Sequence, residues 1–179
     1  MDHAATVVSV LENTDDPGLS PVHSFGFRLW HVQHAWRRRL EAALAPVDLT
    51  HMQFVVLRAA DHLARQGDQP SQTRLAACIA IDRMMVSKVV RLLDAKGLLV
   101  RAVHPEDTRA HHLVLTEAGR RRLAQAIGIV QAEQGRFFGR LGMERQRAFG
   151  AMLDDLLAFE GNPAFGAPIV TATTVRGGA

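Results

Sequence analysis

The sequence has one cysteine, no tyrosine and no long hydrophobic run among its 179 residues. Cys78 alone forms no disulfide within the chain and supplies no cysteine cluster for a metal, which is typical of a protein from a reducing compartment. The longest nearly apolar run, residues 75–81, is far shorter than the roughly 20 residues that cross a bilayer. The N-terminus also lacks the basic start of a signal peptide. We therefore expect a cytoplasmic protein without a membrane partner.

Sequence motifs for catalysis are also missing. The chain has no Gly-x-Ser-x-Gly, no His-Glu-x-x-His, no phosphate-cradling glycine loop and no dinucleotide fingerprint. His31 and His34 are one helical step apart, but no nearby Cys or acid completes a metal-ligand set at a recognisable spacing. We expect no enzyme activity, no cofactor and no metal.

Positive charge is absent from the start of the chain and concentrated in its middle. The 27 residues before Arg28 contain four acids and no Lys or Arg, whereas residues 74–122 contain ten basic and five acidic side chains. The overall composition, 47% hydrophobic and 22% charged, is that of a folded globular protein. The excess of positive charge in the middle predicts an anionic partner there.

The helical period begins at Phe25. Apolar residues recur at steps of three and four from Phe25 to Ala43, which predicts a helix. A second stripe on another face, formed by Phe27, Trp30 and His34, predicts that this helix is buried on two sides. In so short a chain, the second neighbour is most simply another subunit.

Three capping signals mark the helices that follow. Thr50 and Gln53 have the spacing of a capping box, while Ser71 and Asp82 are placed to cap two further helices. The last of these helices should end at Gly97, which suits the left-handed C-terminal position. A short helix and a longer one joined by about three residues predict a helix-turn-helix.

The helix that begins after Asp82 has two different faces. One is apolar and should be buried, and the other is cationic with a hydroxyl group. Such a basic face fits a DNA major groove, although an ordinary solvated helix face is the alternative. Met84 is expected to touch thymine methyl groups or to pack, and packing is the first expectation for Met85. The apolar face consists of Val86, Val89, Val90 and Leu93, and the basic one of Met84, Ser87, Lys88 and Arg91 with Arg83 beside them.

Two β-prone runs, residues 98–103 and 110–115, predict a hairpin directly after the basic helix. Arg109 lies at its tip with Arg101 and His104 nearby, so the hairpin reads as a wing whose arginine inserts into a narrow minor groove. Asp107 is expected to stabilise the wing by capping the turn or orienting Arg109, and simple turn chemistry is the alternative. The run 120–122 is interpreted as solvated arginines, with phosphate contact as the alternative.

From Phe25 to Glu160, these residues resemble the MarR (multiple-antibiotic-resistance-regulator) family of dimeric winged-helix transcription factors. The segments that carry the resemblance are Leu49-Thr50-x-x-Gln53-Phe54-x-x-Leu57, Leu75-Ala76, Leu93-x-x-x-Gly97-Leu98-x-x-Arg101, Asp107-x-Arg109 and Leu115-Thr116-x-x-Gly119.

The resemblance implies a mainly α fold with a small β wing, in which a winged helix-turn-helix core is flanked by N- and C-terminal dimerisation helices. Residues 24–45 and 117–160 would be the dimerisation helices, residues 49–116 the DNA-binding core, residues 1–23 a flexible acidic arm and residues 161–179 a tail. It also implies a homodimeric repressor that binds a palindromic operator in double-stranded DNA and is released by a small aromatic or phenolic ligand. The expected DNA-contacting residues are Ser71, Thr73, Arg83, Met84, Ser87, Lys88, Arg91, Arg101 and Arg109.

In such a regulator the effector pocket would lie between the dimerisation helices and the DNA-binding core. Trp30, His34 and Phe54 are then the candidate lining residues, although core or interface packing is the alternative for all three. Two other hypotheses for the function stay open. One is a redox-responsive regulator acting through Cys78, whose default interpretation is a small buried residue. The other is a winged-helix protein-interaction module that does not bind DNA.

Overall fold

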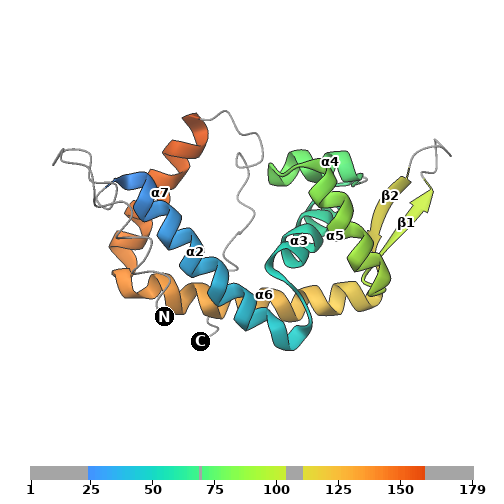
Figure 1. Ribbon diagram of the computed structural model, residues 1–179, viewed down its shortest axis with the longest axis horizontal. Coiled ribbons are helices and arrows are strands. Elements are labelled where there is room, and N and C mark those ends of the chain that lie inside the picture. The colour runs from blue at the N-terminus through green and yellow to red at the C-terminus, as the bar shows by residue number, and fades with distance from the viewer. Residues whose placement is uncertain (1–23, 69, 104–110, 160–179) are drawn as a thin grey trace, which may run out of the picture. The chain divides into compact units, whose positions relative to one another are not determined.

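The computed structural model describes residues 24–68, 70–103 and 111–159 and is mainly helical with a small two-stranded sheet (Figure 1). This confirms the predicted fold class. The chain divides into two compact units, residues 1–42 and residues 43–179. The tip of the predicted wing and both predicted terminal segments lie outside the described residues.

The described part of the first unit belongs to helix α2, Phe25–Leu44, as the helical period predicts. The Ser24 hydroxyl accepts a hydrogen bond from the Phe27 backbone N–H at 3.1 Å, which satisfies one free donor at the start of the helix. The expected burial on two sides is not present in the single chain. Phe25 is 88% exposed, and Leu29, Trp30 and Val32 are exposed as well.

The second unit contains all the remaining elements. Each predicted helix of the core is present, and the two strands form the predicted antiparallel hairpin. The bounds are η2 Ala45–Val47, α3 His51–Arg65, α4 Gln72–Ile79, α5 Arg83–Ala95, β1 Leu99–Val103, β2 His111–Leu115, α6 Glu117–Phe138, η3 Gly139–Leu141 and α7 Gly142–Phe159.

The predicted caps are formed. The Thr50 hydroxyl accepts from the Gln53 backbone N–H, and the Gln53 side chain accepts from the Thr50 backbone N–H, so the capping box is complete. Ser71 caps α4, and Asp82 caps α5 by accepting from two backbone N–H groups. These contacts satisfy backbone donors that would otherwise face solvent without a partner in the helix.

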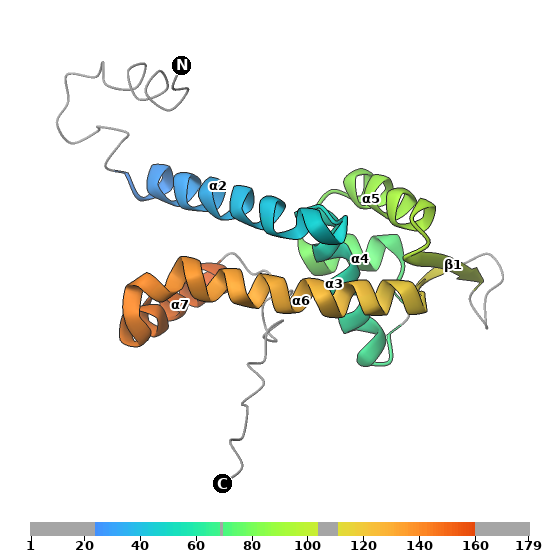
Figure 2. The same ribbon diagram turned by 90° about the horizontal axis from the view of Figure 1, so that it is seen from below.

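One hydrophobic core holds the second unit together. It joins α3, α4 and α5 to the hairpin and to the first half of α6, which runs along the base of this bundle (Figures 1 and 2). The predicted apolar face of α5 is buried in it, because Val86, Val90 and Leu93 are at most 1% exposed. Burying an aliphatic side chain of this size stabilises the fold by about 1.5 to 3 kcal/mol.

The hairpin is fixed to this core at its base. Leu99 pairs with Leu115, and the Leu113 N–H donates to the Pro70 carbonyl at 2.8 Å. The Thr116 hydroxyl donates to the Gly97 carbonyl at 2.7 Å. The position of the wing therefore depends on contacts with both ends of the α4–α5 segment.

Candidate nucleic-acid interface

Helices α4 and α5 are joined by the three residues 80–82, as the sequence predicts. Ala80 has a φ of 51°, which turns the chain sharply after α4, and Asp82 then starts α5. Val86, Val89 and Val90 of α5 pack toward the core, so the opposite side of the helix faces outward. This geometry is a helix-turn-helix with an outward-facing second helix.

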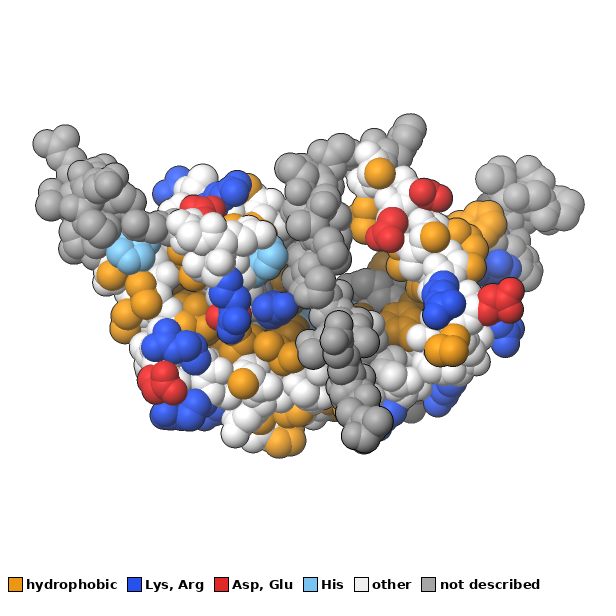
Figure 3. All heavy atoms as spheres, turned by 180° about the vertical axis from the view of Figure 1, so that it is seen from behind, with side chains coloured by type: hydrophobic (Ala, Val, Ile, Leu, Met, Phe, Trp, Pro, Cys, Tyr) orange, Lys and Arg blue, Asp and Glu red, His pale blue; other side chains and the backbone are white. Residues whose placement is uncertain are grey.

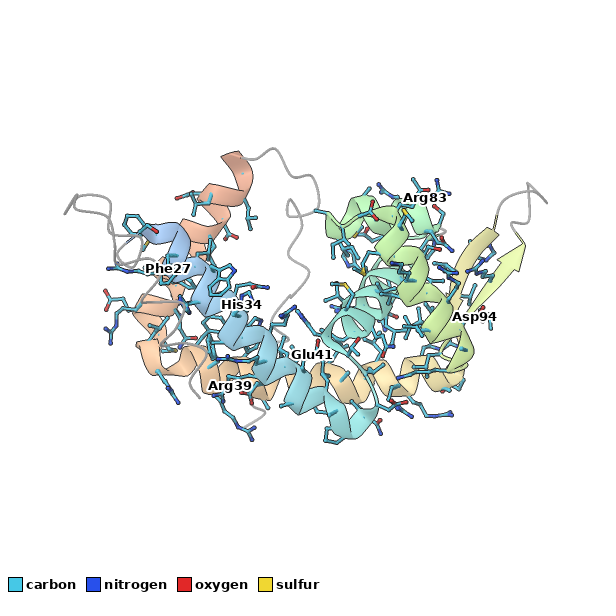
Figure 4. All side chains as sticks on the ribbon, viewed as in Figure 1. Phe27, His34, Arg39, Glu41, Arg83 and Asp94 are labelled. Carbon is cyan, nitrogen blue, oxygen red and sulfur yellow. The ribbon has the colours of Figure 1, made fainter. Side chains whose placement is uncertain are left out.

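The outward side of α5 is basic. Arg83, Lys88 and Arg91 are exposed, and Ser87 is partly buried among them. The Arg91 side-chain Nε donates to the Ser87 carbonyl at 3.4 Å, which holds the guanidinium along this face. Figure 4 shows Arg83 at the N-terminal end of α5 and Asp94 at the other end, beside β1. With Met84, helix α5 thus carries five of the predicted contact residues.

The two methionines at the start of α5 do not pack into the core. Met84 is 71% exposed and Met85 is 47% exposed. Packing was the first expectation for Met85, and it is wrong because Met85 lies at the edge of the apolar stripe, about 40° of helical rotation from Val89, with about half of its surface in solvent. Met84 was expected either to pack or to touch thymine methyl groups, and its exposure leaves the second interpretation.

The start of α4 places two further predicted residues near the turn. Thr73 is exposed, and the Ser71 hydroxyl accepts from the Arg74 N–H at 3.1 Å. The sequence did not single out Arg74, whose Nε lies 2.8 Å from Asp68 Oδ2. That hydrogen bond and the nearby carboxylate charge raise the pKa of Arg74. Arg74 is exposed on the same short helix and adds to its positive charge.

Of the predicted wing residues, only Arg101 lies among the described residues. It faces Leu113 across the hairpin, on the side of the sheet that also carries the buried Leu99. Arg101 is nevertheless exposed. Arg109, Asp107 and His104 lie outside the described residues.

The arginine run at the start of α6 has a structural role that the sequence did not indicate. Arg120 donates to the Leu115 carbonyl at 2.8 Å and pairs with Glu117, which also pairs with Arg121. Arg122 donates to the Val47 carbonyl. The reverse face of the molecule shows basic and acidic side chains next to one another (Figure 3). Glu117 therefore offsets one of the three positive charges, and Arg120 and Arg122 are each held by a backbone carbonyl.

The predicted effector residues are divided between the two units. Trp30 and His34 belong to α2, and their ring centroids lie 4.0 Å apart. Figure 4 shows His34 along this helix, with Phe27 nearer its start. His34 Nδ1 lies 3.2 Å from the Trp30 carbonyl. Phe54 belongs to α3 and packs against the core of the second unit. The ligand role of these three residues stays a prediction.

A cleft of about 290 Å³ lies inside the second unit, between the end of α3, strand β2 and the start of α6. None of the predicted effector residues lines it. Its charged lining residues include Asp61 and Asp68, which are paired with Arg65 and Arg74 respectively.

Cys78 is partly buried in α4 and packs against the core. Burial raises the pKa of its thiol, and the positive charge of Arg74 opposes this only in part. A raised pKa keeps the sulfur protonated, and the thiol form is a poor nucleophile. This environment favours the interpretation of Cys78 as a small packing residue.

Residues 24–68, 70–103 and 111–159 contain no group of three His, Cys, Asp or Glu side chains that is arranged to hold a metal ion. Within the same ranges no helix by itself combines the length and apolar character of a bilayer span. Two consecutive segments joined by a bend, Phe25–Val47 and His51–Arg65, together have the length and composition of a bilayer span. Much of the second segment is buried in the core described above.

A basic, exposed second helix followed by a β hairpin defines a winged helix-turn-helix protein. A sequence profile described as MarR family matches residues 47–110. Over 144 residues the chain is 38% identical to the HTH-type transcriptional regulator YdcH of Bacillus subtilis strain 168, which covers 80% of this chain and 94% of the relative. The HTH-type transcriptional repressor Rv2887 of Mycobacterium tuberculosis H37Rv is 30% identical over 139 residues, covering 78% of this chain and 97% of the repressor. The chain belongs to the MarR family of transcriptional regulators.

Solved structures agree with this assignment. CouR from Rhodococcus jostii RHA1 bound to p-coumaroyl-CoA superposes with a TM-score of 0.67 at 29% identity, covering 81% of this chain and 94% of CouR. CouR bound to a 23-mer DNA duplex gives the same TM-score and identity, with 80% and 99% covered. Rv2887 in complex with salicylic acid gives 0.60 at 30% identity, covering 79% and 98%. These relatives are transcriptional regulators and not enzymes.

Proposed function

We propose that the chain is a homodimeric DNA-binding repressor that recognises a palindromic operator and is released from it by a small aromatic ligand. The observation that carries the proposal is the outward face of α5, where Arg83, Lys88 and Arg91 are exposed on the helix that leads into the hairpin. A helix of this diameter fits the DNA major groove, and Arg and Lys donate both to phosphates and to guanine.

The remaining DNA contacts follow from their places around α5. Ser71 and Thr73 at the start of α4 supply hydroxyl groups for the phosphate backbone. Arg101 and Arg109 would approach the adjacent minor groove, where a narrow groove concentrates negative potential, and Asp107 would orient Arg109 without itself contacting DNA. CouR has been solved on a DNA duplex, which supports this use of the shared fold.

The apolar surface of the flanking helices supports a dimer. Phe25, Leu29 and Trp30 of α2 are exposed in the single chain, and so are Met143, Met152 and Leu156 of α7. Large apolar side chains left in water in this number mark an interaction surface. A second copy of the chain is the partner that also accounts for a palindromic operator. A two-fold dimer places its recognition helices one DNA turn apart, roughly 34 to 36 Å.

An aromatic effector is supported by the relatives and by α2. CouR has been solved with p-coumaroyl-CoA and Rv2887 with salicylic acid. On α2 the rings of Trp30 and His34 lie 4.0 Å apart, and Phe27 and His31 continue the aromatic row. Flat rings of this kind stack with an aromatic ligand, and Phe54 of α3 would supply a further apolar surface.

The test has three linked measurements on the full chain. Selection from a random duplex library identifies the bound sequence, and analytical ultracentrifugation gives the mass of the free protein. A thermal-shift screen of aromatic acids then finds ligands, which are added to the protein–DNA complex. We expect an inverted repeat, a dimer, and a ligand that both raises the melting temperature and weakens DNA binding. A stable monomer that binds no duplex at low salt would refute the proposal and favour the protein-interaction module.

A further inference from the structure

Met84 has the most exposed large apolar side chain on α5. It is 71% exposed, against 55% for Leu92 and 47% for Met85. Packing among the described residues does not account for a long apolar side chain at this position, and an exposed large apolar residue on an otherwise charged face points to a partner.

The place of Met84 on the helix is well defined. It is the second residue of α5, and its backbone N–H donates to Asp82 Oδ1 at 2.8 Å. Met84, Ser87 or Lys88, and Arg91 follow one another at steps of three or four and therefore share one face. In helix-turn-helix proteins the N-terminal residues of the second helix meet the base edges in the major groove. Met84 then approaches the bases, with its charged neighbours toward the phosphates.

The chemistry of the side chain selects the group that it can contact. A thioether has no hydrogen to donate and accepts weakly, so it recognises none of the donor and acceptor patterns in the major groove. Thymine alone presents an apolar methyl group there, and a flexible, polarisable side chain packs well against a methyl group. We infer that Met84 reads the C5-methyl group of a thymine in each half of the operator.

This inference rests on the proposed function, because it names the base that the same helix recognises. A protein partner is less consistent with the surroundings of Met84. Arg83 precedes it, and Lys88 and Arg91 follow on the same face, so the apolar area at the helix start is small and bordered by cations. Such a border suits a polyanion better than an apolar protein surface.

The experiment replaces thymine by deoxyuridine, which removes only the methyl group and leaves the base pairing unchanged. A duplex selected from a random library by the wild-type protein is synthesised with each thymine replaced in turn, and the dissociation constant is measured for each. At one position in each half-site, we expect the loss of the methyl group to weaken binding about fourfold, the ratio that corresponds to about 0.8 kcal/mol for one buried carbon group. Replacing both should weaken it by about fifteenfold.

Matched variants assign the effect to Met84. Met84→Ala should bind the thymine and deoxyuridine duplexes equally, and Met84→Leu should keep the difference because it keeps an apolar side chain. Met85→Ala and Leu92→Ala remove the other two exposed large apolar side chains of α5 and should also keep the difference. The melting temperature of Met84→Ala should equal that of the wild type, since the side chain is exposed.

Salt separates this contact from the charged ones. The ratio between the two duplexes should not change as the salt concentration rises, because a neutral contact releases no counterions. A selected duplex without any methyl-sensitive thymine would overturn the inference while leaving the proposed function intact. So would a Met84→Ala protein that keeps the full difference. A library that yields no bound duplex would overturn both.

Discussion

The carbonyl oxygen of Leu98 occupies the place where a side chain on residue 119 would begin. A Cβ atom built on Gly119 would lie 2.0 Å from this oxygen, which also accepts the Thr116 N–H at 3.2 Å. The first turn of α6 can approach the end of the α5 segment this closely only because residue 119 is glycine. The contact sets where the wing leaves the core.

Gly119→Ala should therefore destabilise the protein, although alanine is ordinarily the better helix residue by about 1 kcal/mol. The backbone must move to admit the methyl group, which typically costs about 1 to 3 kcal/mol of unfolding free energy. Urea denaturation measures the loss. Gly128→Ala is the control, because it lies in the same helix with nothing within 4 Å of its Cβ position, and it should stabilise by roughly 0.5 to 1 kcal/mol. Equal effects of the two substitutions would contradict the close approach.

Asp48 should contribute a pH-dependent part of the stability. The Lys96 side chain donates to Asp48 Oδ1 at 2.8 Å and lowers the pKa of this carboxyl below its ordinary value of 3.8. The contribution is complete above that value and is lost as the pH falls through the lower pKa of the folded state. The melting temperature should be higher for the wild type than for Asp48→Asn at neutral pH, and the difference should shrink below about pH 4. A difference that persists in acid would show that charge is not its cause.

Lys88→Ala should weaken DNA binding by a similar amount for different sequences. The side chain is exposed on the outward face of α5, and an ammonium group that contacts a phosphate releases about one counterion. The slope of log affinity against log salt should become less steep by about one unit for each contact removed. Arg147→Ala, on the exposed surface of α7, is the control and should leave the slope unchanged. An unchanged slope for Lys88→Ala would remove it from the interface.

Arg109→Ala should behave differently, because the wing arginine is expected to make a specific contact. We expect a loss of about 1 to 3 kcal/mol in binding free energy on the selected duplex, and relaxed base preference at the ends of the site. Fluorescence anisotropy with the selected duplex and with end-substituted duplexes measures both. Binding at wild-type strength would exclude Arg109 from the DNA contacts.

Cys78 should react slowly with alkylating reagents in the native protein. Burial raises the pKa of its thiol, so little thiolate is present at neutral pH. Iodoacetamide labelling should be much slower in the native protein than in denaturant, and Cys78→Ser should bind DNA like the wild type in the presence of peroxide. Release of DNA by peroxide from the wild type but not from Cys78→Ser would instead establish the redox-responsive alternative.

Features formed by residues close together in the chain could be predicted from the sequence. Thr50 and Gln53 cap each other across three residues, and Asp82 accepts hydrogen bonds from the next turn, so these helix starts could be read directly from spacing. The period of the apolar residues in α5 identified its buried face for the same reason. Because that face is buried, Lys88 and Arg91 were expected on the opposite, exposed face of α5.

Contacts between distant residues were not predictable in this way. Arg122 belongs to a run interpreted as solvated, yet it donates to the Val47 carbonyl, and Lys96 reaches Asp48 across 48 positions. Met85 was expected to pack and is half exposed, because burial depends on which neighbours arrive and not on the hydrophobicity of the residue.

The sequence by itself determined the helices, their caps, the turn between α4 and α5 and the basic character of the second helix, since each depends on residues within a few positions of one another. Only the tertiary structure decided which arginines are tied to carbonyl groups, why residue 119 must be glycine and that Met84 stands free in solvent. Those facts depend on chain segments that meet in space, and the free energy of such meetings is not encoded in any local spacing.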